Sequence, residues 1–235
     1  MTTTDALARS SAIGPYFAVS CGPRSDTARF RPLTDLYQDT AALADYVAAV
    51  GQRLGTGPDR VAASTLHIGT AARLWSIALA TAALTGRVPD LAPERLRWRT
   101  PESGPIDLWL PEASALTGGD VPDGLHETVL VRNLLPLGDA LRRQFGLSAR
   151  ILPGNAASAL IGAVRVLDAH VPDAPHPPLP VAVALLGRDP LASAGDLTVT
   201  PFTYRRRSCC LYYRVDGRGL CGDCVLHRRE AGRRG

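Results

Sequence analysis

The chain has 235 residues, of which 46% are hydrophobic and 20% charged, values typical of a globular protein with a sizeable core. All 26 basic residues are arginine, and the lack of lysine excludes a Walker-type phosphate loop and a lysine Schiff base. The sequence contains no apolar run of about 18 residues, and its start has no basic segment followed by an apolar one. We therefore expect no membrane span, no secretory signal and a cytoplasmic location.

Apolar periodicity predicts mainly helices in the first third of the chain. From Thr34 to Leu54 apolar residues recur at helical spacing, and Gly55 follows as a stop. A second, alanine-rich helix is expected from about Val61 to Leu84, ended by Gly86. Within residues 96–110, the segments LRWR and IDLWL are separated by proline and glycine, which predicts two short strands of a hairpin or meander.

Helices are also expected in the middle of the chain. The segment Leu125–Phe145 predicts a helix or helix pair that Pro136 kinks or splits. Asn155 is expected to cap the alanine-rich helix that follows it. The segment 171–180 contains five prolines, so no helix can cross it, and a short helix is expected at Val181–Leu186.

The expected fold class is α+β and helix-dominated, with two parts. Residues 1–195 form a mainly helical body with a short β-hairpin or meander, and residues 196–235 form a small cysteine-bearing module that begins with a strand at Leu197–Tyr204. His67 and Arg73 on the long helix are expected to be satisfied structural polar groups. The three tryptophans are expected in the core, and they are Trp75, Trp98 and Trp109.

The cysteines are the clearest chemical signal. Four of the five lie close together near the C-terminus with the spacing C-C-x10-C-x2-C, and they are Cys209, Cys210, Cys221 and Cys224. Clustered thiols in a cytoplasmic chain favour metal or redox chemistry over disulfides, and thiolates bind zinc or iron–sulfur clusters. Adjacent cysteines would strain at one small tetrahedral ion, whereas a two-iron cluster relieves that strain. On residues alone, a 2Fe–2S cluster, structural zinc and inert or disulfide-forming thiols all stay open.

Positive charge is concentrated at the same end of the chain. From Pro201 onward nine arginines face three acidic residues, whereas the remainder is net acidic. The candidates for tuning a cluster, or for attracting an anionic chelate or an acidic donor, are Arg205, Arg206, Arg207 and Arg214. No recognised nucleic-acid motif surrounds them, so a nucleic-acid partner is not expected.

Three further features are given minor roles. Cys21 lies far from the other cysteines and is expected to be a bystander. His227 follows Cys224 closely, but with four cysteines present it is expected to be solvated or near the metal rather than a ligand. The glycines of 217–222 spell G-x-G-x-x-G without a following helix, so we expect them to turn the connector rather than bind a dinucleotide.

The C-C-x10-C-x2-C segment resembles the C-terminal 2Fe–2S signature of the FhuF family of ferric-siderophore reductases. Leu66–Ser76 and Gly154–Leu167 resemble the family's two recurring helical segments, and Arg205–Val215 resembles the start of its cluster segment. Pro153 departs from the pattern, because relatives often carry tryptophan before the Gly-Asn pair.

The resemblance implies a 2Fe–2S cluster held by Cys209, Cys210, Cys221 and Cys224, on a helical body that serves as a siderophore platform. It implies one-electron transfer to siderophore-bound Fe(III), with release of Fe(II) in the cytoplasm and without a catalytic acid, base or nucleophile. The implied partners are a ferric siderophore and a cytosolic donor of ferredoxin or flavoprotein type. The alternatives are a zinc-stabilised binding module with a basic tail and a 2Fe–2S redox or iron sensor without turnover.

Overall fold

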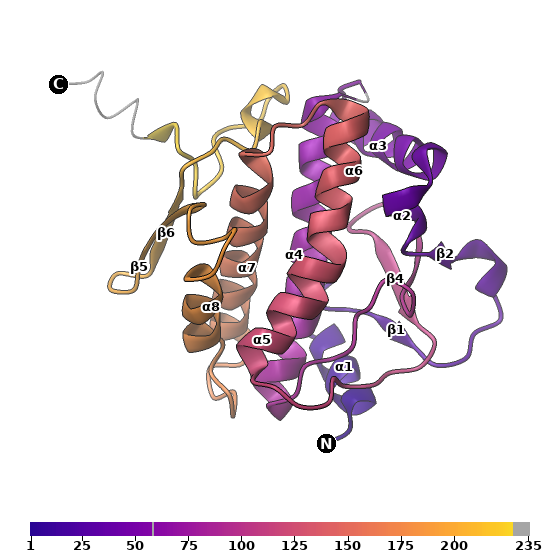
Figure 1. Cartoon of the computed structure of the whole chain (residues 1–235), viewed down its shortest axis with the longest axis vertical. Helices are drawn as coiled ribbons and strands as arrows, with labels where there is room; N and C mark the ends of the chain where they lie inside the picture. Colours follow the sequence, from indigo (N-terminus) through magenta and orange to yellow (C-terminus); the bar gives the residue numbers. More distant parts are fainter. Residues whose placement is uncertain (58, 228–235) are drawn as a thin grey trace.

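The computed structural model describes residues 1–57 and 59–227 and has an α+β fold dominated by helices (Figure 1). The helices are α1 (Thr3–Ser11), α2 (Asp35–Gln38), α3 (Thr40–Leu54), α4 (Arg60–Thr85), α5 (Val121–Leu125), the π-helical segment η2 (His126–Leu134), α6 (Leu135–Phe145), α7 (Ile151–His170) and α8 (Pro178–Leu186), with short 3-10 turns η1 (Thr27–Arg29) and η3 (Tyr212–Arg214). The strands are β1 (Ser20–Cys21), β2 (Arg31–Pro32), β3 (Arg97–Arg99), β4 (Asp107–Leu110), β5 (Gly195–Thr198) and β6 (Thr203–Arg206).

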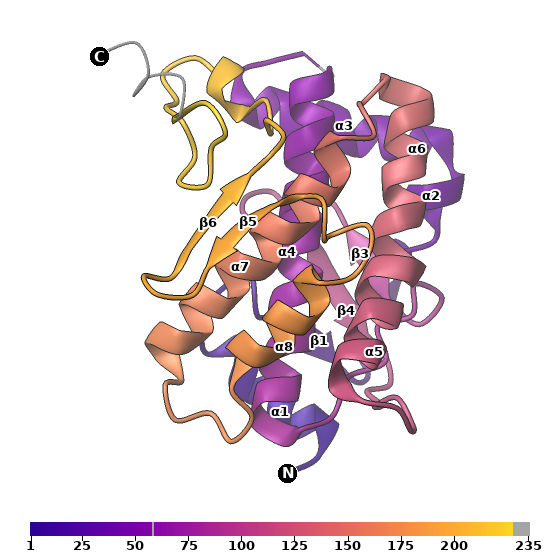
Figure 2. The same cartoon turned by 60° about the vertical axis from the view of Figure 1, so that its left-hand side comes forward.

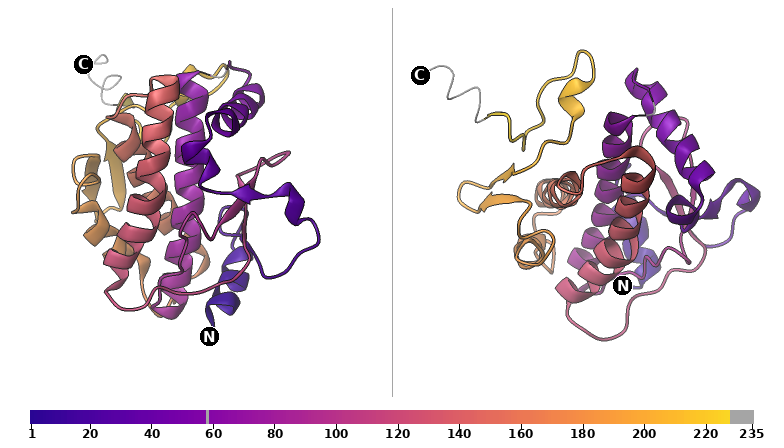
Figure 3. Two further views of the ribbon diagram at one scale, coloured as in Figure 1. Left: turned by 45° about the vertical axis from the view of Figure 1, so that its right-hand side comes forward. Right: turned by 45° about the horizontal axis from the view of Figure 1, so that its top comes forward.

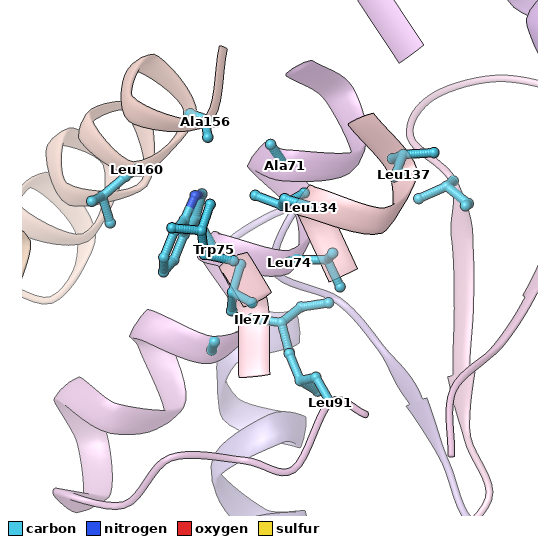
Figure 4. Close-up of a cluster of buried hydrophobic side chains, with 14 of the residues drawn as sticks. Ala71, Leu74, Trp75, Ile77, Leu91, Leu134, Leu137, Ala156 and Leu160 are labelled. Atoms are coloured by element: carbon cyan, nitrogen blue, oxygen red, sulfur yellow. The ribbon is translucent and has the colours of Figure 1, made fainter. Parts of the chain in front are cut away.

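Helix α4 is the centre of the fold, with α1, α3, α6 and α7 packed around it (Figures 1 and 2). Trp75 is completely buried between α4 and α7, where it faces Ala156 and Leu160 (Figure 4). Among the described helices, α4 alone is long and apolar enough to cross a membrane, but 78% of its most apolar stretch is buried inside the protein. The expectation that all three tryptophans lie in the core is confirmed.

The ends of the predicted helices agree with their stop signals. Gly55 and Gly86 adopt left-handed backbone conformations at the ends of α3 and α4, as expected. The helix expected over Thr34–Leu54 is instead broken at Asp39, because its carboxylate accepts hydrogen bonds from the backbone N–H groups of Ala41 and Ala42 and starts α3 anew.

The four-stranded sheet has the order β1-β4-β3-β2. The expected antiparallel pairing of the strands around residues 97–110 is confirmed, with Trp98 opposite Leu108. Strands β1 and β2 are two residues long, so no alternating pattern marks them in the sequence.

The split expected at Pro136 is wrong: α5, η2 and α6 form one continuous helical run, and Pro136 lies just after the change from π-helical to α-helical hydrogen bonding, which accommodates its missing N–H group. The expected capping role of Asn155 is wrong. Helix α7 begins at Ile151 and accommodates Pro153 in its first turn, so Asn155 lies inside the helix with its side chain fully buried. The expected short helix is present and begins earlier, at Pro178.

The strand expected over Leu197–Tyr204 is instead a hairpin. Strands β5 and β6 pair antiparallel, with Leu197 opposite Tyr204, and Pro201 lies in the turn between them, where it donates no ladder hydrogen bond. Strand β6 packs on α7, and η3 packs on α4. The cysteine-bearing segment thus lies beside the N-terminal ends of α4 and α7, as the view from the top shows (Figure 3).

Candidate metal centre

The chain brings two of the four clustered thiols into direct contact. The sulfur atoms of Cys210, just after β6, and Cys221, at the end of the connector, lie 3.8 Å apart. Two thiolates bound at about 2.3 Å to one tetrahedral metal ion have sulfur atoms about 3.8 Å apart, so this pair fits a shared metal. The described residues contain no group of three or more His, Cys, Asp or Glu side chains spaced for a single metal ion.

The other two thiols receive backbone hydrogen bonds. The N–H of Leu211 donates to Cys209 Sγ at 3.3 Å, and the N–H of Leu226 donates to Cys224 Sγ at 3.4 Å. Leu211 is the only residue other than glycine with a left-handed backbone (φ 69°) in the described part of the chain. This strained backbone directs the Leu211 amide to the sulfur, and N–H donors of this kind stabilise negative charge on sulfur.

The contact between Cys210 and Cys221 changes how the pair ionises. The hydrogen bond between their sulfur atoms lowers the pKa of Cys210 to about 6 and raises the pKa of Cys221. The pair therefore loses its first proton readily and retains the second. Burial raises the pKa of Cys209, so metal binding must displace that proton as well.

A chain of buried hydrogen bonds fixes the cysteine segment to the helical body. Arg206 Nη2 donates to Asn155 Oδ1 at 2.6 Å, and Asn155 Nδ2 donates to the carbonyl oxygen of Ser64 at 3.1 Å. The Ser64 hydroxyl in turn donates to the carbonyl oxygen of Cys210 at 2.8 Å. These bonds connect β6, α7, α4 and the first cysteine pair, so the position of Cys210 depends on both central helices.

Arg206 is a buried cation with unused donors. Its side chain is only 1% exposed, and Nε and Nη1 have no hydrogen-bond partner among the described residues. Beside the hydrogen bond from Cys221, the charge of Arg206 also lowers the pKa of Cys210. Burying a cation that lacks a full set of partners costs free energy of folding. A neighbouring group with negative charge would offset this cost, and a cluster of two irons and four thiolates carries such a charge.

Close approach at the start of α7 makes this arrangement possible. A Cβ atom on Gly154 would lie 2.9 Å from Arg206 Nη2 and closer still to the hydroxyl of Ser208. Any larger residue would force apart the two segments. Gly154 therefore serves close packing against the cysteine segment and does not act as a helix stop.

The other three arginines near the cysteines have different surroundings. Arg205 donates to the carbonyl oxygen of Cys224 at 3.1 Å, and Arg207 pairs with Asp196 at 2.5 Å. Arg214 is exposed over a tyrosine ring. The structure thus separates one buried arginine from three at or near the surface. The four arginines after residue 227 lie outside the described residues.

Three residues with minor expected roles are also placed. Cys21 lies in β1 of the four-stranded sheet, and burial raises its pKa. His227 lies beside the cysteine loop, with Nε2 3.1 Å from the carbonyl oxygen of Cys221. Gly217 has a left-handed backbone in the connector, as a turn requires.

The expectation of satisfied polar groups on α4 is confirmed for Arg73 and wrong for His67. Arg73 donates to the carbonyl oxygens of Ile106 and Pro15 at 3.0 and 2.5 Å. Neither ring nitrogen of His67 has a well-formed hydrogen bond among the described residues; burial lowers its pKa to about 4, and a weak interaction with the backbone of Leu134 acts in the opposite direction. His67 is therefore a neutral, buried imidazole that the sequence pattern did not distinguish from a paired one.

The sequence did not indicate that Ser64 and Asn155 fix the cysteine segment through hydrogen bonds. Neither residue is a usual metal ligand, and the only signal in the sequence was the Gly-Asn pair in the segment that resembles the FhuF family. A cavity of about 460 Å³ beside Cys210 and Cys221 was likewise not foreseen, because its lining comes from segments far apart in the chain.

Comparison with known families adds one finding. Residues 206–226 match the model of the FhuF 2Fe-2S C-terminal domain, a segment that contains Arg206 and all four clustered cysteines. No curated protein matches the chain. The match identifies the cofactor of this segment as a 2Fe–2S cluster and does not support the zinc alternative.

Proposed function

We propose, from the premise that residues 206–226 are an FhuF-type 2Fe–2S domain, that the protein is a cytoplasmic ferric-siderophore reductase. The observation that carries the proposal is the match of residues 206–226 to the FhuF 2Fe-2S C-terminal domain, together with the contact between Cys210 and Cys221 and the backbone hydrogen bonds to the other two sulfur atoms.

The proposed ligands of the cluster are Cys209, Cys210, Cys221 and Cys224. When bound, the cluster supplies one-electron transfer between a donor of ferredoxin or flavoprotein type and siderophore-bound Fe(III). The donor set supports this assignment through its four soft sulfur atoms, two backbone N–H bonds to sulfur and the contact between one sulfur pair.

The residues around the thiols hold the site and balance its charge. Arg206 offsets the negative charge that increases on reduction, and Asn155 and Ser64 keep this cation and the Cys210 backbone in place. Arg205, Arg207 and Arg214 stay candidates for attracting an acidic donor over the surface.

In this proposal the two parts of the chain have different roles. The body, residues 1–195, is the platform for the chelate, and the module, residues 196–235, carries the redox centre. Hydroxamate and catecholate oxygens are hard ligands that hold Fe(III) more tightly than the softer Fe(II), so reduction loosens the chelate and releases iron. No acid, base or nucleophile is required.

The test is an anaerobic assay of the full chain with a ferric siderophore, a ferredoxin or flavoprotein donor and a dye that traps Fe(II). We expect Fe(II) to form at a rate that depends on both protein and donor. A protein that takes up electrons but leaves every ferric hydroxamate and catecholate unreduced would be a sensor, which would overturn the reductase assignment.

A further inference from the structure

The structure contains a second cavity, which we call the arginine cavity, with a volume of about 780 Å³. Its lining comes from the segments 15–18 and 99–107, the 3-10 turn η1 and helix α4. No cysteine is among its described lining residues, so it is separate from the cysteine segment. Its volume lies within the range of small-molecule sites, about 300–1,000 Å³.

Three arginines line this cavity, and two of them lack a carboxylate partner. The three are Arg29, Arg73 and Arg99. Arg99 donates to Asp107 at 2.6 Å and also pairs with Asp26, so its charge is balanced locally. Among the described residues, no Asp or Glu lies within ion-pair distance of Arg29 or Arg73.

Arg73 is the buried cation of this pair. It extends from the middle of α4, and only 4% of the residue is exposed. Its Nε and Nη1 donate to the carbonyl oxygens of Ile106 and Pro15, which carry no net charge, and Nη2 is left to meet a ligand. Burial lowers the pKa of Arg73 to about 10, so it stays charged at neutral pH. Burying this charge costs free energy of folding, and a bound anion would offset the cost.

The other lining residues add donors and little negative charge. Arg29 is exposed at the end of η1, and its guanidinium makes no hydrogen bond to a described residue. Thr100 and Ser103 bring two hydroxyl groups to the same lining. The remaining acidic residue, Glu102, is exposed, so solvent and salt screen its charge. The cavity therefore offers a net positive charge and several hydrogen-bond donors.

These donors fit a phosphate group better than a carboxylate. A phosphate monoester carries a charge of about −2 at neutral pH and has three acceptor oxygens, so it can accept from Arg29, Arg73 and a hydroxyl group together. A carboxylate has a single charge and two oxygens in one plane. The volume of about 780 Å³ also leaves room for an organic part beside the phosphate.

We propose that the arginine cavity binds a small, polar phosphate monoester through Arg29 and Arg73. Arg73 holds the phosphate from α4, and Arg29 contacts it from η1. The site is additional to the proposed redox function, because binding there breaks no bond, moves no electron and uses no cysteine. The bound ligand joins η1 to the central helix, so it should also raise the Tm of the protein.

The experiment measures binding of glycerol 3-phosphate to the cluster-loaded full chain by calorimetry at low salt. Arg29→Gln should weaken binding at least tenfold, because it removes charge-assisted hydrogen bonds to the phosphate. Arg31→Gln is the matched control and should leave binding unchanged, because Arg31 is also exposed but is not among the described lining residues. Arg73→Gln should weaken binding as well. If this buried change unfolds the chain, the comparison of Arg29→Gln with Arg31→Gln decides.

Two further ligands test the chemical class. Glycerate, which carries a carboxylate in place of the phosphate ester, should bind at least tenfold more weakly to the wild type. Inorganic phosphate should also bind more weakly, because it lacks the organic part. The proposal is overturned if the wild type does not bind glycerol 3-phosphate, or if Arg29→Gln and Arg31→Gln weaken binding equally. It is also overturned if glycerate or inorganic phosphate binds as tightly as the ester.

Discussion

Arg206 shows how one side chain can serve both the fold and the chemistry. It is nearly inaccessible to water, one of its nitrogens is fixed by Asn155, and two others have no partner among the described residues. Positive charge near an iron–sulfur cluster stabilises the reduced form and raises the reduction potential. Arg207, the next residue, is exposed and paired with Asp196, so its charge is screened by solvent.

The first prediction compares these two neighbours. Arg206→Gln should lower the reduction potential enough to change the ratio of reduced to oxidised protein at least tenfold, a shift of about 59 mV for one electron. Arg207→Gln should shift it much less, and Arg206→Lys should restore part of the loss, because the charge stays. Anaerobic redox titration measures all three, and equal potentials for the two glutamine variants would contradict the assignment.

The second prediction concerns the thiols themselves. Cys210→Ser and Cys221→Ser should lose most of the iron and sulfide bound per chain, because each removes a proposed ligand. Cys21→Ser should keep the wild-type iron content and visible spectrum, since Cys21 lies in the sheet. Iron and acid-labile sulfide analysis of anaerobically purified protein decides the point. A loss of iron in Cys21→Ser as large as in the other variants would count against the ligand set.

The third prediction follows from the buried imidazole of His67. Its pKa is lowered to about 4 in the folded protein, against about 6.5 in an unfolded chain. As the pH falls below about 6.5, His67 becomes protonated in the unfolded chain but stays neutral in the folded protein. The free energy of unfolding therefore decreases until the pH reaches about 4. Between pH 7.5 and 5 this loss is about 2 kcal/mol.

Urea unfolding at pH 7.5 and pH 5 measures this loss of folding stability. His67→Leu should lose less stability on acidification than the wild type by about that amount, because leucine has no proton to gain. Effects of acid on the bound cluster are common to both proteins and cancel in the comparison. An identical pH dependence in wild type and variant would show that His67 does not set it.

At the scale of elements, the N-terminal part of α7 joins the core to the cysteine segment. Gly154 allows Arg206 and Ser208 to approach the helix, and Asn155 bonds them to α4. Strand β6 enters this contact from the hairpin and leads directly to the first cysteines. Displacing β6 from α7 would therefore disturb the redox centre before it disturbed the core around Trp75.

The fourth prediction uses two glycines of this same helix. Gly154→Ala should decrease cluster loading and lower the Tm, because the new Cβ would collide with Ser208 and lie 2.9 Å from Arg206 Nη2. Gly162→Ala has open space and should raise stability by up to about 1 kcal/mol through helix propensity. Thermal unfolding and iron content measure both, and a similar gain in stability in both variants would refute the close-packing role.

The same elements show what local sequence can and cannot reveal. The ends of α3 and α4 were predictable because left-handed glycines at Gly55 and Gly86 leave a local signature. The buried position of Asn155 inside α7 was not predictable, because its hydrogen-bond partners lie on α4 and β6, far away in the chain. Strands β1 and β2 were missed for a related reason: two residues carry no periodicity, and only the neighbouring strands define them.

For the site, the cysteine spacing was informative because four thiols within one short segment favour metal or redox chemistry. The family match confirms the 2Fe–2S cofactor that this spacing suggested. The special position of Arg206 among its neighbouring arginines was not predictable, because burial depends on the contact with α7. The cavity was hidden for the same reason, since α3, α4 and the cysteine segment meet only in the folded chain.

On the scale of the whole molecule, core and redox centre share the same two helices. Helices α4 and α7 form the principal contact of the body, and their N-terminal ends carry Ser64 and Asn155, which hold the cysteine segment. The cavity lies where this segment meets α3 and α4. The same two helices thus hold the core and fix the position of the cysteine segment.

The most direct test of this account is a single-turnover reaction of the reduced protein with a ferric siderophore. The full chain is reduced anaerobically, freed of reductant and mixed with the chelate, while the visible spectrum and trapped Fe(II) are followed together. The account predicts that the oxidised spectrum returns as Fe(II) appears, with one Fe(II) formed for each electron the protein loses. A reduced protein whose spectrum stays unchanged in excess chelate, with no Fe(II) formed, would contradict it.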